Sequence, residues 1–375
     1  MRLRLRAIGA ACGAWALGVP IVRAQTPAPL VLHHIGPLTG VLAASNQEAI
    51  DGARLFLDAF NARGGLRGRA VRLQTLDDAQ DPKRALEHFE ALVASRQVLA
   101  LLLPRTTPAM EALLPGVARY GVPVIGPQAG GSFVNRPPRR EVFTLRASYQ
   151  KEAEVAIRQQ HATGMRRFGL LLADDAFGRD TLAGIERTFK ELGLEATVTA
   201  RIDNRKPDVT AALQQMLAQR PQVVLLIVSA KAAADFVRGY RAAGAQATFI
   251  SLSNTSNNDY IKALGDQAAG AIVMQVMPSP FAATTPLTRE YVAAAARGQH
   301  AVSYAGLYGF ATAKLATLAL ARAGAEPTRA SLVRALERLG DVDLGGYPLR
   351  YGPGERTGSS YVDPTIITEQ GRFRR

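Results

Sequence analysis

The stretch that decides the fold runs from residue 35 to residue 82 and opens with I-G-P-L-T-G. A segment follows in which apolar residues recur every three or four positions, on one helical face: Ile50, Ala53, Leu57 and Phe60. Gly64 and Gly65 in N-A-R-G-G-L-R-G-R-A-V-R-L (61–73) end that helix, and Val71 and Leu73 then alternate with polar residues as in a strand. The stretch therefore predicts strand, turn, amphipathic helix, glycine break and strand.

Outside this stretch, short apolar segments alternate with helical patterns along the chain. The segments that we predict as strands are residues 30–35, 71–76, 98–103, 122–125, 168–173 and 223–228. Several are apolar throughout, which is typical of parallel strands covered by helices on both faces. One intervening helix carries apolar residues at helical spacing and ends at Gly193: Leu182, Ile185, Phe189 and Leu192. The alternation predicts an α/β fold with parallel sheets flanked by helices.

Residues 1–24 have the features of an export signal. The segment begins with three arginines, and residues 8–22 are uncharged and mostly apolar. Residues 22–24 (V-R-A) fit a small-residue cleavage site, so we place the mature start at Gln25. The apolar part, about 15 residues, is shorter than the roughly 20 that span a bilayer, which favours a cleaved signal over a retained anchor. We expect a periplasmic location.

Composition narrows the function further. The only cysteine, Cys12, lies in the predicted signal, so we expect no disulfide and no thiolate chemistry in the mature chain. The formal net charge of +14 raises the possibility of a nucleic-acid partner. However, the arginines are dispersed among acidic residues along helices, and few aromatic residues are present to stack on bases. We interpret the charge as a solvated surface, with no nucleic-acid partner.

Five blocks of sequence, taken together, resemble a known family. They are the opening block, G-V-P-V-I-G-P-Q-A-G (121–130), G-M-R-R-F-G-L-L-L-A-D-D-A-F-G-R-D (164–180), the segment 220–244, and S-Y-A-G-L-Y-G-F-A-T-A-K (303–314). In this order and spacing they resemble the type-I periplasmic solute-binding proteins of the branched-chain amino acid (leucine/isoleucine/valine-binding) ABC transporter family. The resemblance covers nearly all of residues 30–367.

The resemblance implies two lobes joined by three crossings that act as a hinge. Breaks in periodicity at residues 143–150, 277–281 and 351–354 are the candidate crossings. One lobe would comprise residues 25–146 and 278–351, and the other residues 147–277 and 352–375. The family implies a monomeric substrate-binding component of an ABC importer, with a small-molecule ligand and permease subunits as partners and no cofactor. A ligand-sensing regulatory protein with the same fold remains the alternative.

In an open α/β sheet, ligands bind outside the carboxyl ends of the strands, so we examined the residues that follow each predicted strand. Thr107 is placed to cap a helix, with Pro108 at its first position, and free N–H groups there would suit a carboxylate. The resemblance implies that Thr106 and Thr107 hold that carboxylate, although a cap without a ligand is the alternative. Arg105 could pair with the ligand, but a solvated or acid-paired side chain is favoured.

Two further parts of the first lobe are candidates for ligand contact. The resemblance points to the loop Gln128, Ala129 and Gly130, of which Ala129 matches the family pattern, whereas Gln128 and Gly130 depart from it. Ser45 lies where amino-acid binders carry an aromatic lid residue, and it could equally cap the helix that follows.

The second lobe bears on the ligand's chemistry. Family members that bind branched-chain amino acids hold the ammonium group with tyrosines and a carboxylate, and the corresponding positions here are Phe177, Ser229 and Ser253. A buried ammonium group without a carboxylate costs several kcal/mol. We therefore expect a carboxylate- or amide-type ligand, an amino acid or a related or aromatic compound, and favour one without a free ammonium. Three aspartates could still substitute for the missing acid: Asp174, Asp175 and Asp259.

Metal binding and catalysis have little support in the sequence. The cluster D-D-A-Q-D-P (77–82) lacks EF-hand spacing, and Asp81 before Pro82 suits a helix cap. His33 and His34 point to opposite faces of a strand, so they are a poor metal pair. The sequence contains no G-x-S-x-G, H-E-x-x-H, P-loop or strand-linked G-x-G-x-x-G motif. We expect no enzymatic activity and no metal.

Overall fold

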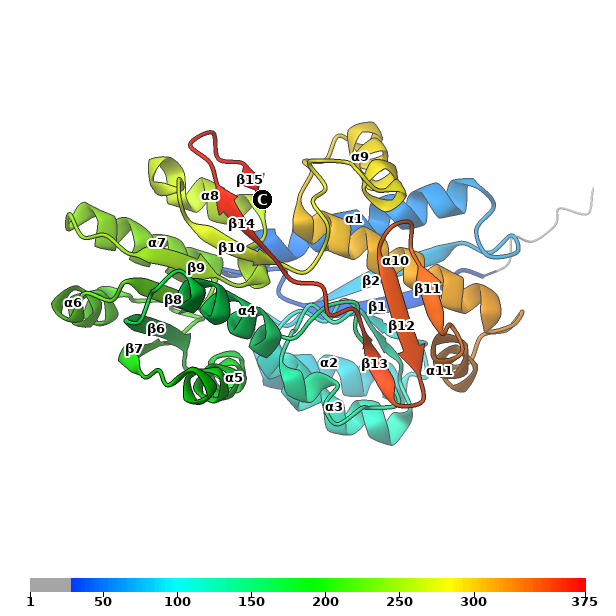
Figure 1. Ribbon diagram of the computed structural model, residues 1–375. Helices are drawn as coiled ribbons and strands as arrows, with labels where there is room; N and C mark the ends of the chain where they lie inside the picture. Colours follow the sequence, from blue (N-terminus) through cyan, green and yellow to red (C-terminus); the bar gives the residue numbers. More distant parts are fainter. Residues whose placement is uncertain (1–27) are drawn as a thin grey trace, which may run out of the picture.

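The computed structural model describes residues 28–375, so the predicted signal at residues 1–24 lies outside the described residues. Within residues 28–375, no helix is both long and apolar enough to cross a membrane. The described chain forms two lobes, each built on its own sheet and lying side by side in Figure 1.

The first lobe is built on a five-stranded parallel sheet in the order β2-β1-β3-β4-β5. Its strands are β1 (Leu30–Gly36), β2 (Val71–Asp77), β3 (Leu101–Leu102), β4 (Val124–Ile125) and β5 (Val142–Phe143). Its helices are α1 (Ala43–Ala62), α2 (Pro82–Ala94), α3 (Thr107–Tyr120), α9 (Pro286–Gly298), α10 (Tyr304–Arg322) and α11 (Arg329–Glu337). Helices α1 and α10 lie on one side of this sheet, and α2 and α3 lie on the other (Figure 1).

The second lobe is built on a seven-stranded sheet in the order β15-β14-β10-β9-β8-β6-β7. Its strands are β6 (Phe168–Ala173), β7 (Ala196–Ile202), β8 (Val223–Ile227), β9 (Thr248–Ser251), β10 (Ile272–Gln275), β14 (Asp363–Ile367) and β15 (Phe373–Arg374). Its α-helices are α4 (Tyr149–Ala162), α5 (Ala176–Leu192), α6 (Thr210–Gln219), α7 (Ala230–Ala242) and α8 (Asn258–Leu264). Short 3-10 turns are η2 (Ser253–Thr255) and η3 (Gly265–Gln267) in this lobe, and η1 (Ser132–Val134) between β4 and β5 in the first lobe. Strands β6 to β10 are parallel, whereas β14 and β15 are antiparallel additions at one edge.

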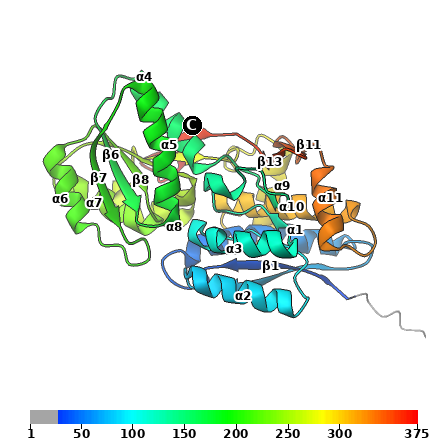
Figure 2. The ribbon, with the colours of Figure 1, turned by 90° about the horizontal axis from the view of Figure 1, so that it is seen from below.

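Each sheet is covered on both faces, as the uniformly apolar strands predicted. Strand β6 shows the pattern, because Leu171 packs with the side chains of α6 and α7, whereas Leu170 and Leu172 pack with those of α4 and α5. Figure 2 shows the same arrangement from another side, with β6, β7 and β8 between these helices. The α/β class and the two-lobed architecture are therefore confirmed.

The pairing of α1 with α10 depends on small residues. A Cβ atom at Gly309 would lie 1.8 Å from the carbonyl oxygen of Ala49, and one at Gly52 would lie 1.9 Å from that of Gly306. Any side chain at these positions would push the two helices apart. Helices α9 and α10 follow β10, so the chain returns to the first lobe after it has built most of the second.

One predicted crossing is wrong. Residues 351–354 do not connect the lobes, because β12 (Pro348–Gly352) and β13 (Glu355–Gly358) form an antiparallel hairpin whose turn is Pro353-Gly354. With β11 (Asp341–Asp343) they form a third, three-stranded sheet beside the first lobe. The chain reaches the larger sheet only through residues 359–362. The limits of the lobes stay a proposal, with the last one moved to that segment.

Candidate functional site

A cavity of about 460 Å³ lies between the two lobes, at the carboxyl ends of their strands. Its walls come from loops that follow strands of both sheets, which is where ligands bind in open α/β sheets. The first lobe contributes Leu42, Gln80, Pro82, Arg105, Thr106, Thr107 and Pro108. The second lobe contributes Tyr149, Asp174, Asp175, Phe177, Asp203, Asn204, Arg205, Ser229 and Asn254.

The N-terminus of helix α3 borders this cavity. Thr106, not Thr107, is the N-cap, because its side chain accepts a hydrogen bond from the backbone N–H of Ala109 at 3.2 Å. The predicted cap is therefore shifted by one residue, and Thr107 is the first residue of the helix, with Pro108 second. Both threonines line the cavity, and Thr107 is buried.

Two helices of the second lobe also begin at the cavity. Ser229 caps α7 by accepting from the N–H of Ala232 at 3.3 Å. Asp175 caps α5 and accepts from the N–H groups of Phe177 at 2.8 Å and Gly178 at 3.3 Å. A helix N-terminus carries a partial positive charge. The caps of α3 and α7 are neutral hydroxyls, so these two termini favour an anion in the cavity.

Arg105 adds a full positive charge. The favoured expectation of a solvated or acid-paired side chain is wrong: Arg105 is buried and makes no salt bridge within residues 28–375. Its Nη2 donates to the Oγ of Ser45 at 3.3 Å and to the carbonyl oxygen of Asn254, in the other lobe, at 3.4 Å. Burial lowers the pKa of this guanidinium. Glu48 acts on this guanidinium through its charge alone, so an anionic ligand group would supply a direct ion pair that no side chain of residues 28–375 provides.

An aromatic wall closes one side of the cavity. The rings of Tyr149 and Phe177 lie with their centroids 4.6 Å apart at an angle of 56°. Both residues line the cavity, and both are buried. The wall provides a surface for an apolar or aromatic part of a ligand.

The acidic residues of the cavity lie at its edge or are already engaged. Asp174 and Asp203 are exposed, and Asp203 lies 3.7 Å from Arg205. Asp175 is engaged by the two N–H groups that it caps. Asp259, the third candidate substitute for an ammonium partner, does not line the cavity.

Five of the ten predicted site residues line the large cavity: Arg105, Thr106, Thr107, Phe177 and Ser229. The other five do not: Ser45, Gln128, Ala129, Gly130 and Ser253. Gln128 and Ser253 instead line a smaller cavity of about 40 Å³, which shares Arg105 and Asn254 with the large one. Ala129 and Gly130 follow Gln128 in the same loop, and both are buried.

Hydrogen bonds within the protein explain why the side chains of Ser45 and Gln128 are not available to a ligand. Ser45 is not a helix cap, because it lies inside α1 and its Oγ donates to the carbonyl oxygen of Leu42 at 3.0 Å. The Nε2 of Gln128 donates to the Oδ1 of Asn46 at 3.0 Å and to the carbonyl oxygen of Leu103 at 3.2 Å. Both side chains support the cavity wall from behind.

Among the cavity residues that the sequence did not predict, two asparagines come from loops after β7 and β9. Asn204 follows β7 and accepts from the N–H of Ser229 at 2.6 Å, and Asn254 follows β9 and donates to the carbonyl oxygen of Val228 at 2.8 Å. Neither strand was among those predicted, so the strand-end rule did not point to the polar residues after them. The same rule that found Ser229 would have found both asparagines.

The residues considered for a metal have structural roles. Asp81 caps α2 by accepting from the N–H of Lys83 at 2.9 Å, as predicted. Asp77 accepts from the N–H of Leu38 and the hydroxyl of Thr39, both at 2.8 Å. Burial lowers the pKa of His34 to about 4, so its neutral ring accepts from Asn46. Within residues 28–375, no three His, Cys, Asp or Glu side chains are grouped to hold a metal ion.

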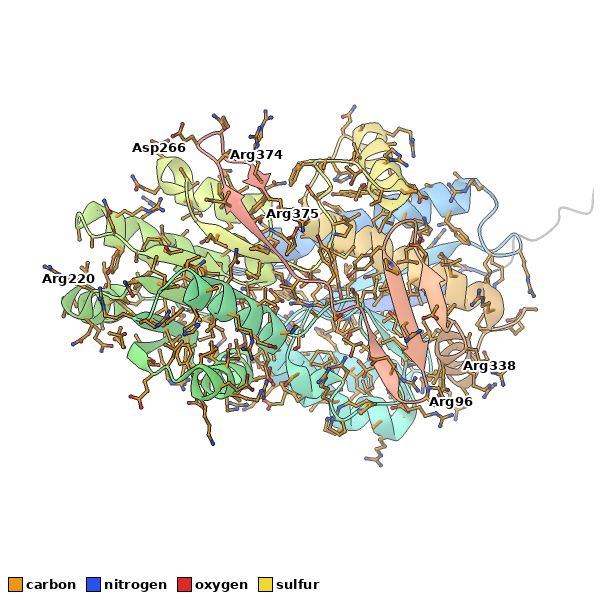
Figure 3. All side chains as sticks on the ribbon, in the orientation of Figure 1. Arg96, Arg220, Asp266, Arg338, Arg374 and Arg375 are labelled. Atoms are coloured by element: carbon orange, nitrogen blue, oxygen red, sulfur yellow. The ribbon has the colours of Figure 1, made fainter. Side chains whose placement is uncertain are left out.

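The charged surface has no single focus among the residues marked in Figure 3. Arg220 lies at the tip of the second lobe, whereas Arg96 and Arg338 lie at the far end of the first. Arg374 and Arg375 lie near the C-terminus, on the same side of the molecule as Asp266.

Comparison with known proteins identifies the family. Residues 33–362 match the family described as periplasmic binding protein. The chain is 24% identical over 247 residues to the Leu/Ile/Val-binding protein BraC3 of Rhizobium johnstonii, across 66% of this chain and 67% of that protein. A substrate-binding periplasmic protein from Ralstonia solanacearum superposes with a TM-score of 0.87 at 31% identity, across 92% of this chain and 99% of that one.

A more distant structure shows the same fold. A fatty acid ABC transporter substrate-binding protein from Thermomonospora curvata superposes with a TM-score of 0.84 at 18% identity, across 92% of this chain and 90% of that one. The family that the sequence suggested is therefore confirmed. The chain belongs to the periplasmic binding protein family, a family of substrate-binding proteins of the periplasm.

Proposed function

We propose that this protein is the substrate-binding component of an ABC importer and takes a small carboxylate- or amide-type ligand, without a free ammonium group, between its lobes. One observation carries the proposal. The cavity joins the N-terminus of α3 to the buried Arg105, which makes no salt bridge within residues 28–375, while the acidic residues of the cavity are exposed or engaged in capping. An anion is favoured there, because within residues 28–375 no buried carboxylate that is free of a capping role lines the cavity to pair with an ammonium group.

Each part of the ligand has a place in the cavity. The carboxylate or amide would lie at Thr106, Thr107 and Arg105, beside the N-terminus of α3 and a guanidinium. The apolar part would lie against Tyr149 and Phe177. A volume of about 460 Å³ is within the range of small-molecule sites and leaves room for an aryl or branched alkyl group.

Binding would shift the protein toward the closed arrangement of its lobes. A ligand that contacts both walls stabilises the closed form over the open one, by its differential affinity for the two. The closed form would then be recognised by the permease subunits in the membrane. The contact between Arg105 and the carbonyl oxygen of Asn254 joins the lobes directly at the cavity.

The proposal is tested by blocking the cavity at Thr107. We expect Thr107→Trp to abolish binding of 3-phenylpropionate and 4-methylpentanoate, because the indole fills the space in front of the α3 N-terminus. Thr210→Trp is the matched control, since Thr210 is also the first residue of a helix but is exposed and outside the cavity. Titration calorimetry measures the affinities, and circular dichroism checks the fold. Unchanged affinity in Thr107→Trp would refute the site.

A further inference from the structure

A buried ion pair lies at the hinge, beside the cleft. Arg146 lies in the first connection between the lobes and is 5% exposed, and Glu152 lies in the first turn of α4 and is fully buried. Their side chains form a salt bridge. Glu152 also accepts from the N–H of Ser253 at 2.7 Å and from its hydroxyl at 2.9 Å.

The surroundings of the guanidinium form a complete cation site. Besides Glu152, its acceptors are the carbonyl oxygen of Gln128 at 2.8 Å, that of Ala147 at 3.0 Å and the Oγ of Ser253 at 2.7 Å. The guanidinium carbon lies 4.3 Å from the centre of the Tyr149 ring, which is a cation–π contact. A carboxylate, a hydroxyl, two carbonyls and an aromatic face are also what an alkylammonium group would need.

This cation site adjoins the ligand cavity. Arg146, Gln128 and Ser253 line the cavity of about 40 Å³, which shares Arg105 and Asn254 with the large one. Tyr149, on which the guanidinium lies, is part of the aromatic wall of the large cavity. A cationic group on a ligand in the large cavity would therefore be close to the position that Arg146 already fills.

The loop that contains Gly130 leaves room for the Arg146 guanidinium because position 130 has no side chain. A Cβ atom at Gly130 would lie 2.6 Å from the Nη2 of Arg146 and 2.7 Å from its Cζ. A hydroxyl-bearing residue at position 130 would collide with the Arg146 side chain. The glycine that departs from the family pattern is thus accounted for by the arginine.

We propose that Arg146 is a built-in cation that occupies the acceptors of Glu152, Ser253 and Gln128, and so makes the cleft reject ligands that carry an ammonium group. The inference rests on the proposed function and deepens it. Removing the arginine would leave a buried carboxylate without a counter-charge, which is unfavourable until another cation takes its place. Arg146 is a specificity-determining residue by this account, and it need not touch the accepted ligand.

Chemical rescue tests whether the vacated position binds a cation. We expect Arg146→Ala to lower the melting temperature, and millimolar methylguanidinium chloride to restore it in a saturable way. Wild type and the double variant Arg146→Ala with Glu152→Gln serve as controls, and neither should be stabilised. Sodium chloride at the same ionic strength separates site binding from a general salt effect. Equal responses of the single and double variants would overturn the inference.

Ligand selectivity distinguishes the proposed role of Arg146 from a purely structural one, because a structural role alone would not change the ratio of affinities for two ligands. The probes are leucine against 4-methylpentanoate and phenylalanine against 3-phenylpropionate, which differ only in the ammonium group. In Arg146→Ala the affinity ratio should shift toward the amino acids by about tenfold or more. Arg146→Lys keeps the charge and should keep the wild-type ratio. An unshifted ratio in Arg146→Ala would contradict the inference.

The outcomes separate this inference from the proposed function. If wild type binds the deaminated probes but Arg146→Ala shows neither rescue nor a shifted ratio, the proposed function stands and the inference fails. If rescue is saturable and depends on Glu152, but wild type binds neither deaminated probe, the built-in cation stands and the proposed ligand class is wrong. If wild type binds leucine as tightly as 4-methylpentanoate, both are wrong. Should Arg146→Ala be insoluble, recovery of folded protein upon refolding with methylguanidinium replaces the melting curve.

Discussion

At the residue scale, Gly130 and Arg146 are coupled by contact. Because a Cβ at position 130 would lie 2.6 Å from the Arg146 Nη2, we expect Gly130→Ala to destabilise the fold by about 1–3 kcal/mol. Urea denaturation measures the change. Gly354→Ala is the control, since nothing lies within 4 Å of a Cβ there.

If the two residues are coupled, the effect of Gly130→Ala on stability should depend on which residue occupies position 146. The cost of Gly130→Ala should be smaller when Arg146 is replaced by the shorter alanine, since the clash is then absent. Equal costs in the two backgrounds would show that the two positions are independent.

Single residues of the site were predictable only where chain position alone reveals them. Ser229 directly follows one predicted strand and Thr107 lies in the short loop after another, so the strand-end rule found them. The role of Arg146 could not be predicted, because its acceptors come from Gln128 and Ser253, which are distant in sequence. Likewise, Arg105 contacts Asn254 across a separation of 149 residues, so its burial was not foreseen.

At the element scale, helix α1 touches helix α8 across the cleft through Glu48. Its carboxylate accepts from the N–H of Asn258, the first residue of α8, at 3.0 Å. Burial raises the pKa of Glu48 from 4.5 to about 7, opposed by the hydrogen bonds of Ser303 and Asn258. The negative charge of Asp259 raises this pKa further, and the positive charge of Arg105 lowers it.

This contact predicts a pH dependence of stability. Between pH 4.5 and about 7 the folded protein holds a proton on Glu48 that the unfolded chain has released. Stability conferred by this group therefore falls as the pH rises through that window, by about 1–3 kcal/mol. Urea denaturation at several pH values measures the fall, and Glu48→Gln should flatten it. An unchanged pH profile in that variant would rule out Glu48 as the source.

Long elements were predicted better than short ones. The helix ending at Gly193 agrees with α5, whose C-cap is that glycine in the left-handed conformation. The predicted strands at 98–103 and 122–125 shrink to two residues each. Leu103 and Gly126, with φ of 59° and 58°, end β3 and β4, and an apolar pattern does not reveal such a backbone reversal. The hairpin of β12 and β13 was missed because its Gly-Pro-Gly turn resembles a linker.

At the scale of the whole molecule, several contacts hold the lobes together around the cavity. Glu48 and Asn258 meet at α1 and α8, and Arg105 meets Asn254 at the cavity itself. Arg179 of α5 donates to both carboxylate oxygens of Glu111 of α3, at 2.9 and 3.0 Å. This last pair is exposed and contributes under about 1 kcal/mol, so it adds little to the stability of the contact between the lobes.

The family and the two-lobed α/β architecture followed from the sequence because they depend on periodicity and on blocks in order. The contacts between the lobes did not follow, because they depend on how two separately folded sheets face each other. Ligand class falls between these cases. The missing acid at positions 177, 229 and 253 suggested the proposed ligand class, and the role proposed for Arg146 would give it a structural reason.

The measurement that tests the central claim most directly is a dye-based thermal-shift comparison of the purified protein with matched ligands. The panel contains leucine and valine, their deaminated acids, aromatic carboxylates, dicarboxylates and short amides. A ligand at a hundred times its dissociation constant should add about 2.7 kcal/mol of stability. We predict stabilisation by carboxylates or amides without an ammonium group. Stabilisation by leucine or valine, with none from their deaminated acids, would contradict it.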